Sequence, residues 1–298
     1  MIKDPYGLDD LFYSAVIKRS PDIAVKDFIS YMKFLYQIPD RFHMGLGYKK
    51  FFGENFMTAT QKFVDSLVSF EYENYWWMFD FKTGRQKYIV NKIMNKLMRI
   101  LHLRYRFGSE KSYFVNIRRE KFIESAREYI DALFDSFAEE NGADNIVLDQ
   151  GVSIRNYRNE MNFFRKSKLI VVDRDPRDNY ADLIKVNFSI GKEFAKTHDV
   201  RKYIEMHHFS RNNQQELMSD PDVLVLKFED LIFHYDESLK RIADFAGLNL
   251  NDHVRKREFF NPDVSIKNVG MWKELIPQQE ADTIASELPE FLYDIPSA

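Results

Sequence analysis

The segment at residues 168–185, KLIVVDRDPRDNYADLIK, constrains the fold most, because a short apolar strand runs directly into an arginine and a helix start. The apolar run at 169–172 predicts a parallel strand covered on both faces. Pro176 suits the first turn of the following helix, with Asp175 as its N-cap. Arg174 brings a permanent charge to the carboxyl end of the strand, where open α/β sheets bind ligands. The segment therefore predicts a phosphate-binding site.

A purely structural interpretation of the same residues stays open, namely a loop held by ion pairs. Such pairs are common at protein surfaces and need no ligand. Its members would be two arginines and three carboxylates: Arg174, Arg177, Asp173, Asp175 and Asp178.

Length and composition favour a globular protein with a sizeable core. The chain has 298 residues, of which 45% are hydrophobic and 30% charged. We expect one domain spanning 1–298, although the length also allows two smaller ones. The net charge of −3 argues against a nucleic-acid partner.

Cysteine usage and hydropathy bear on the compartment. The chain has no cysteine, which excludes disulfides and thiolate metal sites and fits a reducing environment. The start MIKDPYGLDD lacks the apolar core of a signal peptide, and no apolar run approaches the roughly 20 residues of a membrane span. We expect a cytoplasmic protein that is not transmembrane.

The hydrophobic pattern changes near residue 143. Before it, the period of 3.6 predicts helices, the clearest being Asp22–Gln37 closed by Pro39, Arg85–His102, and Glu120–Asn141 closed by Gly142. After it, short apolar runs alternate with helices, as in parallel β-α units. The predicted strands are 145–149, 168–172 and 222–227, in one parallel sheet; the predicted helices are 154–165, 177–196, 201–219 and 236–246, the last ended by Gly247.

Three segments in this order resemble blocks of the PAPS-dependent sulfotransferases of bacterial type, where PAPS is 3′-phosphoadenosine 5′-phosphosulfate. They are Arg-Asp-Pro-Arg-Asp after the strand, VLVLKFEDLIFHYDESLKRIADFAGL at 223–248 and SIKNVGMWKEL at 265–275. The resemblance implies an α/β, P-loop-kinase-like sulfotransferase fold, with a short parallel sheet, helices on both faces and a helical N-terminal half on the acceptor side. It also implies sulfuryl transfer from PAPS to a hydroxyl or amine of a glycan, lipid or small molecule, without a metal.

The resemblance assigns the 3′-phosphate to residues in two of these segments. Arg174 is one contact, and Lys267 is the candidate donor from the later loop, with Ser265 and Asn268 beside it. Asp182 stands where the family often has a phosphate-binding serine, and a carboxylate there would repel phosphate unless protonated or bridged.

Candidate catalytic residues follow from the same resemblance. The predicted strand NIVLDQ at 145–150 occupies the place of a family motif with catalytic groups, which makes Asp149 the candidate base and Gln150 its neighbour in the site. Asp149 could equally bond backbone groups at a strand end. Glu229 and Asp230 also end a predicted strand, where capping and pairing with arginines are an alternative to catalysis.

One family motif has no counterpart. Nothing in the sequence matches the Gly-x-x-x-Ser-Gly-Thr type loop that cradles the 5′-phosphosulfate, and residue 1 falls at what resembles the segment after it. We therefore expect either a longer protein or a form that has lost half of the cofactor site, with weak transfer by residues 1–298 alone. The alternatives are an inactive nucleotide- or ligand-binding protein of the same fold and, third, a relative of nucleotide kinases.

An aromatic segment and a histidine pair complete the candidates. FEYENYWWMFDF at 70–81 suits either a sugar or sterol surface or a buried helix corner, and its acidic residues argue against nucleic acid. His207 and His208 are adjacent and diverge on a helix, so we expect no metal there.

Overall fold

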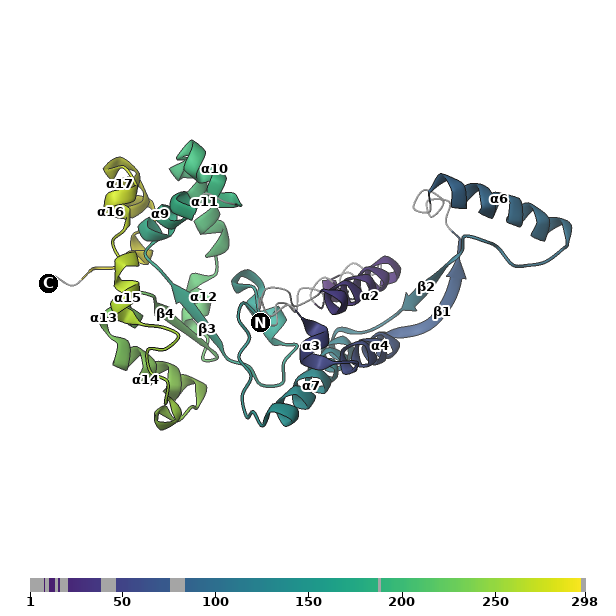
Figure 1. Ribbon diagram of the computed structural model, residues 1–298, viewed down its shortest axis with the longest axis horizontal. Coiled ribbons are helices and arrows are strands. Elements are labelled where there is room, and N and C mark those ends of the chain that lie inside the picture. The colour runs from purple at the N-terminus through teal and green to yellow at the C-terminus, as the bar shows by residue number, and fades with distance from the viewer. Residues whose placement is uncertain are drawn as a thin grey trace. The chain divides into compact units, whose positions relative to one another are not determined.

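The computed structural model describes Leu8, residues 11–13, Val16 and residues 21–38, 47–75, 84–186 and 189–295. The protein is α/β and mostly helical (Figure 1). The chain divides into two compact units, residues 1–165 and 166–298, each with its own buried core. The boundary lies beyond residue 143 because Phe163 and Phe164 pack in the first core.

In its described part, the first unit consists of helices and one antiparallel strand pair. Its elements are α2 (Pro21–Gln37), α3 (Tyr48–Phe52), α4 (Asn55–Leu67), β1 (Val68–Asn74), α6 (Arg85–Ile100), β2 (Glu110–Val115), α7 (Arg119–Asn141), a 3₁₀ turn (Ile154–Asn156) and α8 (Tyr157–Met161).

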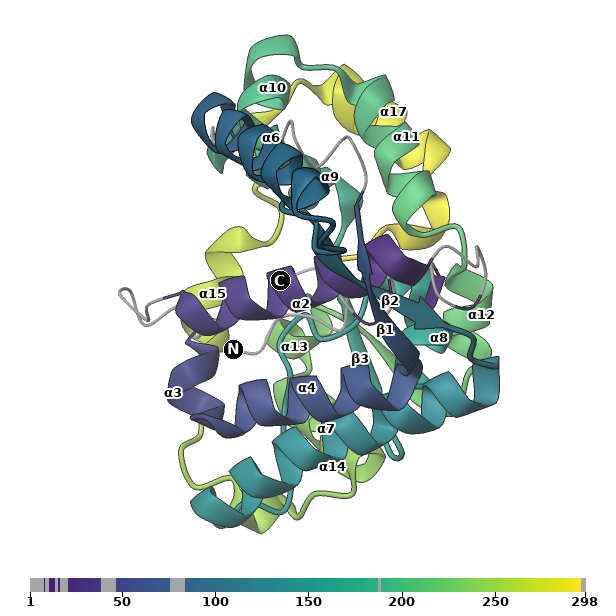
Figure 2. The same cartoon turned by 90° about the vertical axis from the view of Figure 1, so that its right-hand side faces the viewer.

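The core of the first unit lies between α2, α4 and α7, and Figure 2 shows α4 and α7 side by side. The apolar stripe predicted on α7 is buried, with Phe122 at its start and Leu133 near its end. Gly142 ends the helix in the left-handed region at φ +60°, as the sequence predicts. The predicted helix of Asp22–Gln37 is confirmed as α2; Pro39 lies outside the described residues.

The β1–β2 pair was not predicted. Its register runs from Val68 opposite Val115 to Asn74 opposite Glu110. Strand β1 contains the start of the aromatic segment, so the helix-corner interpretation is wrong there; residues 76–81 lie outside the described part of the chain. The Phe70 ring stacks on Phe114 with centroids 4.8 Å apart, which is a cross-strand contact.

The second unit contains a two-stranded parallel sheet and a set of short helices. Its elements are β3 (Leu169–Asp173), α9 (Pro176–Val186), α10 (Ile190–Thr197), α11 (Val200–Ser210), α12 (Gln214–Ser219), β4 (Val223–Lys227), α13 (Asp230–Phe233), α14 (Tyr235–Ala246), α15 (Pro262–Ser265), α16 (Trp272–Leu275), α17 (Gln278–Glu287) and 3₁₀ turns at Leu250–Asp252, Ile266–Asn268 and Pro289–Phe291.

Several predicted helices are shorter than expected. The helix expected at 177–196 is two helices, α9 and α10, and that at 201–219 is also two, α11 and α12. At this break, Arg211 in the turn after α11 and Gln214 at the start of α12 both donate to the Asp173 carboxylate. The helix expected at 154–165 is reduced to a 3₁₀ turn and α8.

The parallel pairing of the second and third predicted strands is confirmed. Leu169 lies opposite Val223, and Asp173 lies opposite Lys227. The prediction of a strand at 145–149 is wrong: residues 145–148 form neither strand nor helix, and Val147 is 91% exposed. An apolar run forms a strand only where another strand pairs with it, and no strand pairs with this run among the described residues.

The prediction that β3 is covered on both faces is also wrong. Val171 is 3% exposed, whereas Ile170 and Val172 on the other face are 38% and 48% exposed. Helices α12, α13 and α14 contact β4. The exposed face is therefore that of β3 alone, because Leu226 of β4, which lies opposite Val172, is 1% exposed.

Candidate functional site

Strand β3 ends at Asp173, whose buried carboxylate accepts hydrogen bonds from two residues at the break between α11 and α12. Arg211 donates from Nε to Oδ1 at 2.9 Å, and a second nitrogen of the same guanidinium lies 2.7 Å from that oxygen. Gln214 donates to Oδ2 at 3.3 Å. These bonds fix the strand end and leave Arg174, the next residue, without an ion pair to Asp173.

The start of α9 is closed by its own N-cap. The Asp175 carboxylate accepts the backbone N–H of Arg177 at 2.8 Å, which confirms Asp175 as the cap. The Arg177 guanidinium also donates to Asp175, at 2.6 and 3.0 Å. The ion-pair interpretation of this loop therefore holds for Arg177, and the capped helix end is less available to an external anion than the sequence predicts.

Asp178 ties α9 to the later loop of the resemblance. Its buried carboxylate accepts the backbone N–H of Gly270 at 2.8 Å and that of Trp272 at 3.0 Å. Burial raises the pKa of Asp178, while the two N–H groups act in the opposite direction. Trp272 packs in the second core.

Arg174 contacts the same loop directly. Its guanidinium donates to the backbone oxygen of Asn268 at 2.5 Å and lies 3.1 Å from the sulfur of Met271. The carboxylate of Asp182 is 3.8 Å away, and the charge stands over the Phe228 ring at 5.3 Å from its centroid. Three of the predicted cofactor residues, Arg174, Asp182 and Asn268, are thus brought together.

The Arg174 guanidinium has an unsatisfied hydrogen-bond donor among the described residues. Its Nε is buried and has no partner in the described part of the chain. Met271 offers only a thioether, which is a weak acceptor. A phosphate oxygen would satisfy Nε and replace a weak bond with a charge-assisted one. The residues present therefore fit a phosphate group.

The other two predicted cofactor residues lie in the same loop. Ser265 is half-buried at the end of α15, and Lys267 is exposed in the following 3₁₀ turn. The contacts described for Arg174 include neither of them. Convergence of Arg174 and Lys267 on one phosphate stays a prediction.

Glu229 is fully buried and contacts the loop that carries Arg174. Its Oε1 accepts the backbone N–H of Asp175 at 2.9 Å, and burial raises its pKa. This bond favours the structural interpretation of Glu229 over a catalytic one. Asp230 accepts the hydroxyl of Tyr293 at 3.0 Å and lies 4.0 Å from Arg241, again a structural arrangement.

Sequence analysis gave Asp178 and Glu229 structural roles as an alternative but missed the backbone N–H groups that they accept. The one local signal for Asp178 is its place in the first turn of α9, where a carboxylate is favourable. Its partners, Gly270 and Trp272, lie 92 and 94 positions away, so no local sequence pattern predicts these contacts.

The candidate catalytic residues belong to the first unit. Asp149 and Gln150 are exposed in a turn, and Gln150 has φ +55°. They do not end a strand, which corrects the reason for choosing them. Their catalytic role stays a prediction.

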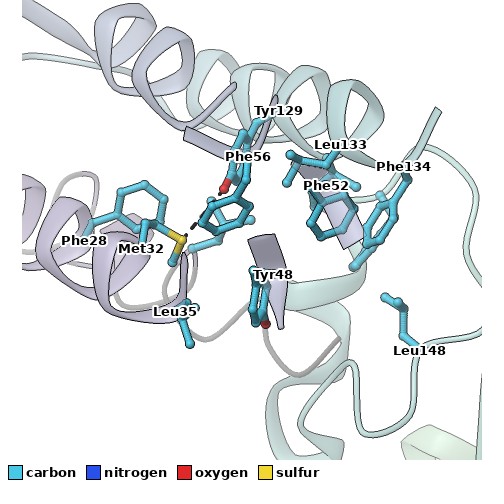
Figure 3. Close-up of a pocket in the computed structure, with 13 residues that line it drawn as sticks. Phe28, Met32, Leu35, Tyr48, Phe52, Phe56, Tyr129, Leu133, Phe134 and Leu148 are labelled. Atoms are coloured by element: carbon cyan, nitrogen blue, oxygen red, sulfur yellow. Dashed lines mark hydrogen bonds between the residues drawn. The ribbon is translucent and has the colours of Figure 1, made fainter. Parts of the chain in front are cut away.

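An apolar hollow lies in the first unit (Figure 3). Its volume is about 50 Å³, and no charged side chain lines it. The Tyr129 hydroxyl at its edge bonds to Thr60 and to the sulfur of Met32. The hollow suits a small apolar group and offers nothing to a phosphate. Its lining is Leu8, Phe28, Met32, Leu35, Tyr48, Phe52, Phe56, Tyr129, Ile130, Leu133, Phe134, Leu148 and Phe164.

Comparison with known proteins found no matching family model, no matching curated sequence and no matching solved structure. None of the helices in the described ranges is long and apolar enough to cross a membrane. Within those ranges, no group of three or more histidine, aspartate or glutamate side chains is arranged to hold a metal ion.

Proposed function

We propose that this chain is a PAPS-dependent sulfotransferase, which moves a sulfuryl group from PAPS to a hydroxyl or amine of a glycan, lipid or small molecule. One observation carries the proposal: Arg174 contacts the backbone of Asn268, 94 positions later in the chain. The resemblance assigns both segments to the 3′-phosphate, and a shared phosphate site requires them to be neighbours.

In this proposal Arg174 holds the 3′-phosphate through Nε and a terminal nitrogen. The N-cap of α9 and the bonds of Asp178 keep the arginine and the loop in place before the nucleotide arrives. Such preorganisation lets fixed charges act without reorganising during the reaction. Asp149 would accept the proton of the acceptor group as its oxygen or nitrogen bonds to sulfur.

Asp182 opposes the nucleotide in this arrangement. Its carboxylate is 3.8 Å from the guanidinium of Arg174 and is half-exposed, so it both competes for the cation and repels phosphate. The proposal therefore makes two opposite predictions for neighbouring residues, and these distinguish a phosphate site from a merely structural arginine.

Titration calorimetry with adenosine 3′,5′-bisphosphate tests the site. We expect Arg174→Ala to weaken binding about ten- to a hundredfold, since a charge-assisted contact contributes on the order of 1.5–3 kcal/mol. Asp182→Ser should strengthen binding by up to about fivefold, because one repulsive and competing charge is removed. The control is Arg201→Ala, which removes an exposed arginine of α11 that pairs with Glu287 of α17. Equal affinity of the parent and Arg174→Ala would refute the nucleotide site.

The binding-protein alternative keeps the same half-site and differs only in chemistry. The sequence feature that favours it is the lack of a match to the phosphosulfate loop. Transfer from labelled PAPS to a panel of hydroxylated acceptors decides between the two. Where transfer is measured, Asp149→Asn should lower turnover by about 10²–10⁴ if Asp149 is the base. Nucleotide binding that depends on Arg174, with no transfer to any acceptor, would support the alternative.

A further inference from the structure

Helix α6 turns its apolar side away from the protein. Ile89, Ile93, Leu97 and Ile100 follow one another at helical spacing and are 48%, 56%, 43% and 63% exposed. Their spacing puts them on one face. An amphipathic helix of a globular protein normally buries such a face, whereas α6 leaves it exposed.

The side of α6 that faces the chain carries two asparagines, Asn91 and Asn95, and the half-buried Met94 and Met98. Asn91 is 7% exposed, and the Asn95 side chain both donates to and accepts from the backbone of Phe107, at 2.9 and 2.7 Å. These bonds fix the rotation of the helix about its axis. The apolar face is therefore held outward by structure, and Figure 1 shows α6 beyond the end of the β1–β2 pair.

The segment that carries this face is strongly basic. Residues 85–109 contain seven lysines and arginines and no acidic residue, although the whole chain has a net charge of −3. Lys92, Lys96 and Arg99 are exposed and lie beside the apolar face. Cations that flank an exposed aliphatic face are typical of helices that lie in the interface of an anionic bilayer.

We propose that α6 binds the surface of anionic lipid membranes, with its isoleucine and leucine side chains among the acyl chains and its lysines and arginines at the headgroups. Charge favours this occupant over a second copy of α6, since two copies of the helix would oppose five cations to five. A nucleic acid would pair with the cations but leave the aliphatic side chains in water. An anionic bilayer satisfies both groups of side chains.

Vesicle flotation with the full chain tests the proposal. We expect binding to vesicles of phosphatidylcholine with about one third phosphatidylserine, weaker binding to pure phosphatidylcholine, and weakening in about 0.5 M NaCl. Lys92→Gln/Lys96→Gln should weaken binding about thirtyfold. Ile93→Ser/Leu97→Ser should weaken it more than about tenfold.

Two double variants serve as matched controls. Lys192→Gln/Lys196→Gln removes two exposed lysines at the same spacing on α10, and Val147→Ser/Val254→Ser removes two valines that are 91% and 83% exposed. Both should bind like the parent. Circular dichroism of each variant checks that the fold is retained.

Three results would overturn the proposal. The first is no vesicle binding by the parent. The second is unchanged binding by either α6 variant. The third is RNA binding that survives Ile93→Ser/Leu97→Ser but is lost in Lys92→Gln/Lys96→Gln, which would assign the segment to a polyanion instead.

Discussion

At the scale of single residues, burial changes the chemistry of side chains that the sequence shows only by type. His207 packs edge-on against Phe291, with ring centroids 4.5 Å apart, and near Tyr203. Its Nδ1 is buried without a partner among the described residues. Burial, helped by the charge of Arg211, lowers the pKa of His207 to about 4.

A pH dependence of stability follows for His207. Its pKa is about 4 in the folded protein and 6.5 in the unfolded chain, so the unfolded state binds the proton first as pH falls. Stability should therefore fall between these two values. We expect His207→Phe to remove on the order of 1–2 kcal/mol of this loss, allowing for partial solvent screening.

Urea unfolding of the parent and of His207→Phe, between a pH of about 7 and about 4, measures this difference. Comparison with the parent cancels the opposite contributions of buried acids such as Asp178 and Glu229, whose pKa values are raised. His208→Gln, at an exposed neighbouring position, is the control. Parallel pH profiles of the parent and His207→Phe would contradict the prediction.

At the scale of elements, α6 and α7 show that a helical period identifies a helix but not what covers it. Both have an apolar stripe, and both were predicted. The stripe of α7 is buried, with Phe122 fully inside, whereas that of α6 is exposed, with Ile93 at 56%. The difference lies in the neighbours: α7 has α4 beside it, and α6 lies beyond the β1–β2 pair.

Truncation of the α7 stripe should be costly. Leu133 is 6% exposed and lines the apolar hollow, so Leu133→Ala enlarges an existing cavity. We expect a loss of about 2–5 kcal/mol in the free energy of unfolding. Glu128→Ala, at an exposed position of the same helix, should change it by less than about 0.5 kcal/mol. Equal midpoints in urea for the two variants would count against this packing.

At the scale of the whole molecule, two separate hydrophobic cores organise the chain. The first contains buried residues between Leu8 and Phe163, and the second contains buried residues between Tyr180 and Phe291. The two groups share no residue. Separate cores allow the two units to unfold as separate cooperative steps.

Scanning calorimetry of the full chain should therefore show two transitions, or a calorimetric enthalpy larger than the van't Hoff enthalpy. Phe122→Ala removes a ring from the first core, and Ile284→Ala removes a side chain from the second; both residues are 0% exposed. Each variant should lower a different transition by about 10 °C. One transition that both variants shift equally would mean that the units unfold together.

The sequence by itself determined the features that depend on neighbouring residues. Asp175 capping α9, Gly142 ending α7 and the strand at 168–172 all follow from local preferences that act over a few positions. The alternation of strand and helix also predicted the parallel pairing of β3 with β4, since two such strands joined through helices pair in that direction.

Only the tertiary structure decided which distant segments meet. The β1–β2 pair, the bonds of Asp178 to Gly270 and Trp272, and the missing strand at 145–149 could not be read locally. A strand is stabilised by hydrogen bonds to a partner, and a buried carboxylate by donors that fold around it. These partners lie tens of positions away, so the local sequence shows that a side chain can form a contact but not which residue it will meet.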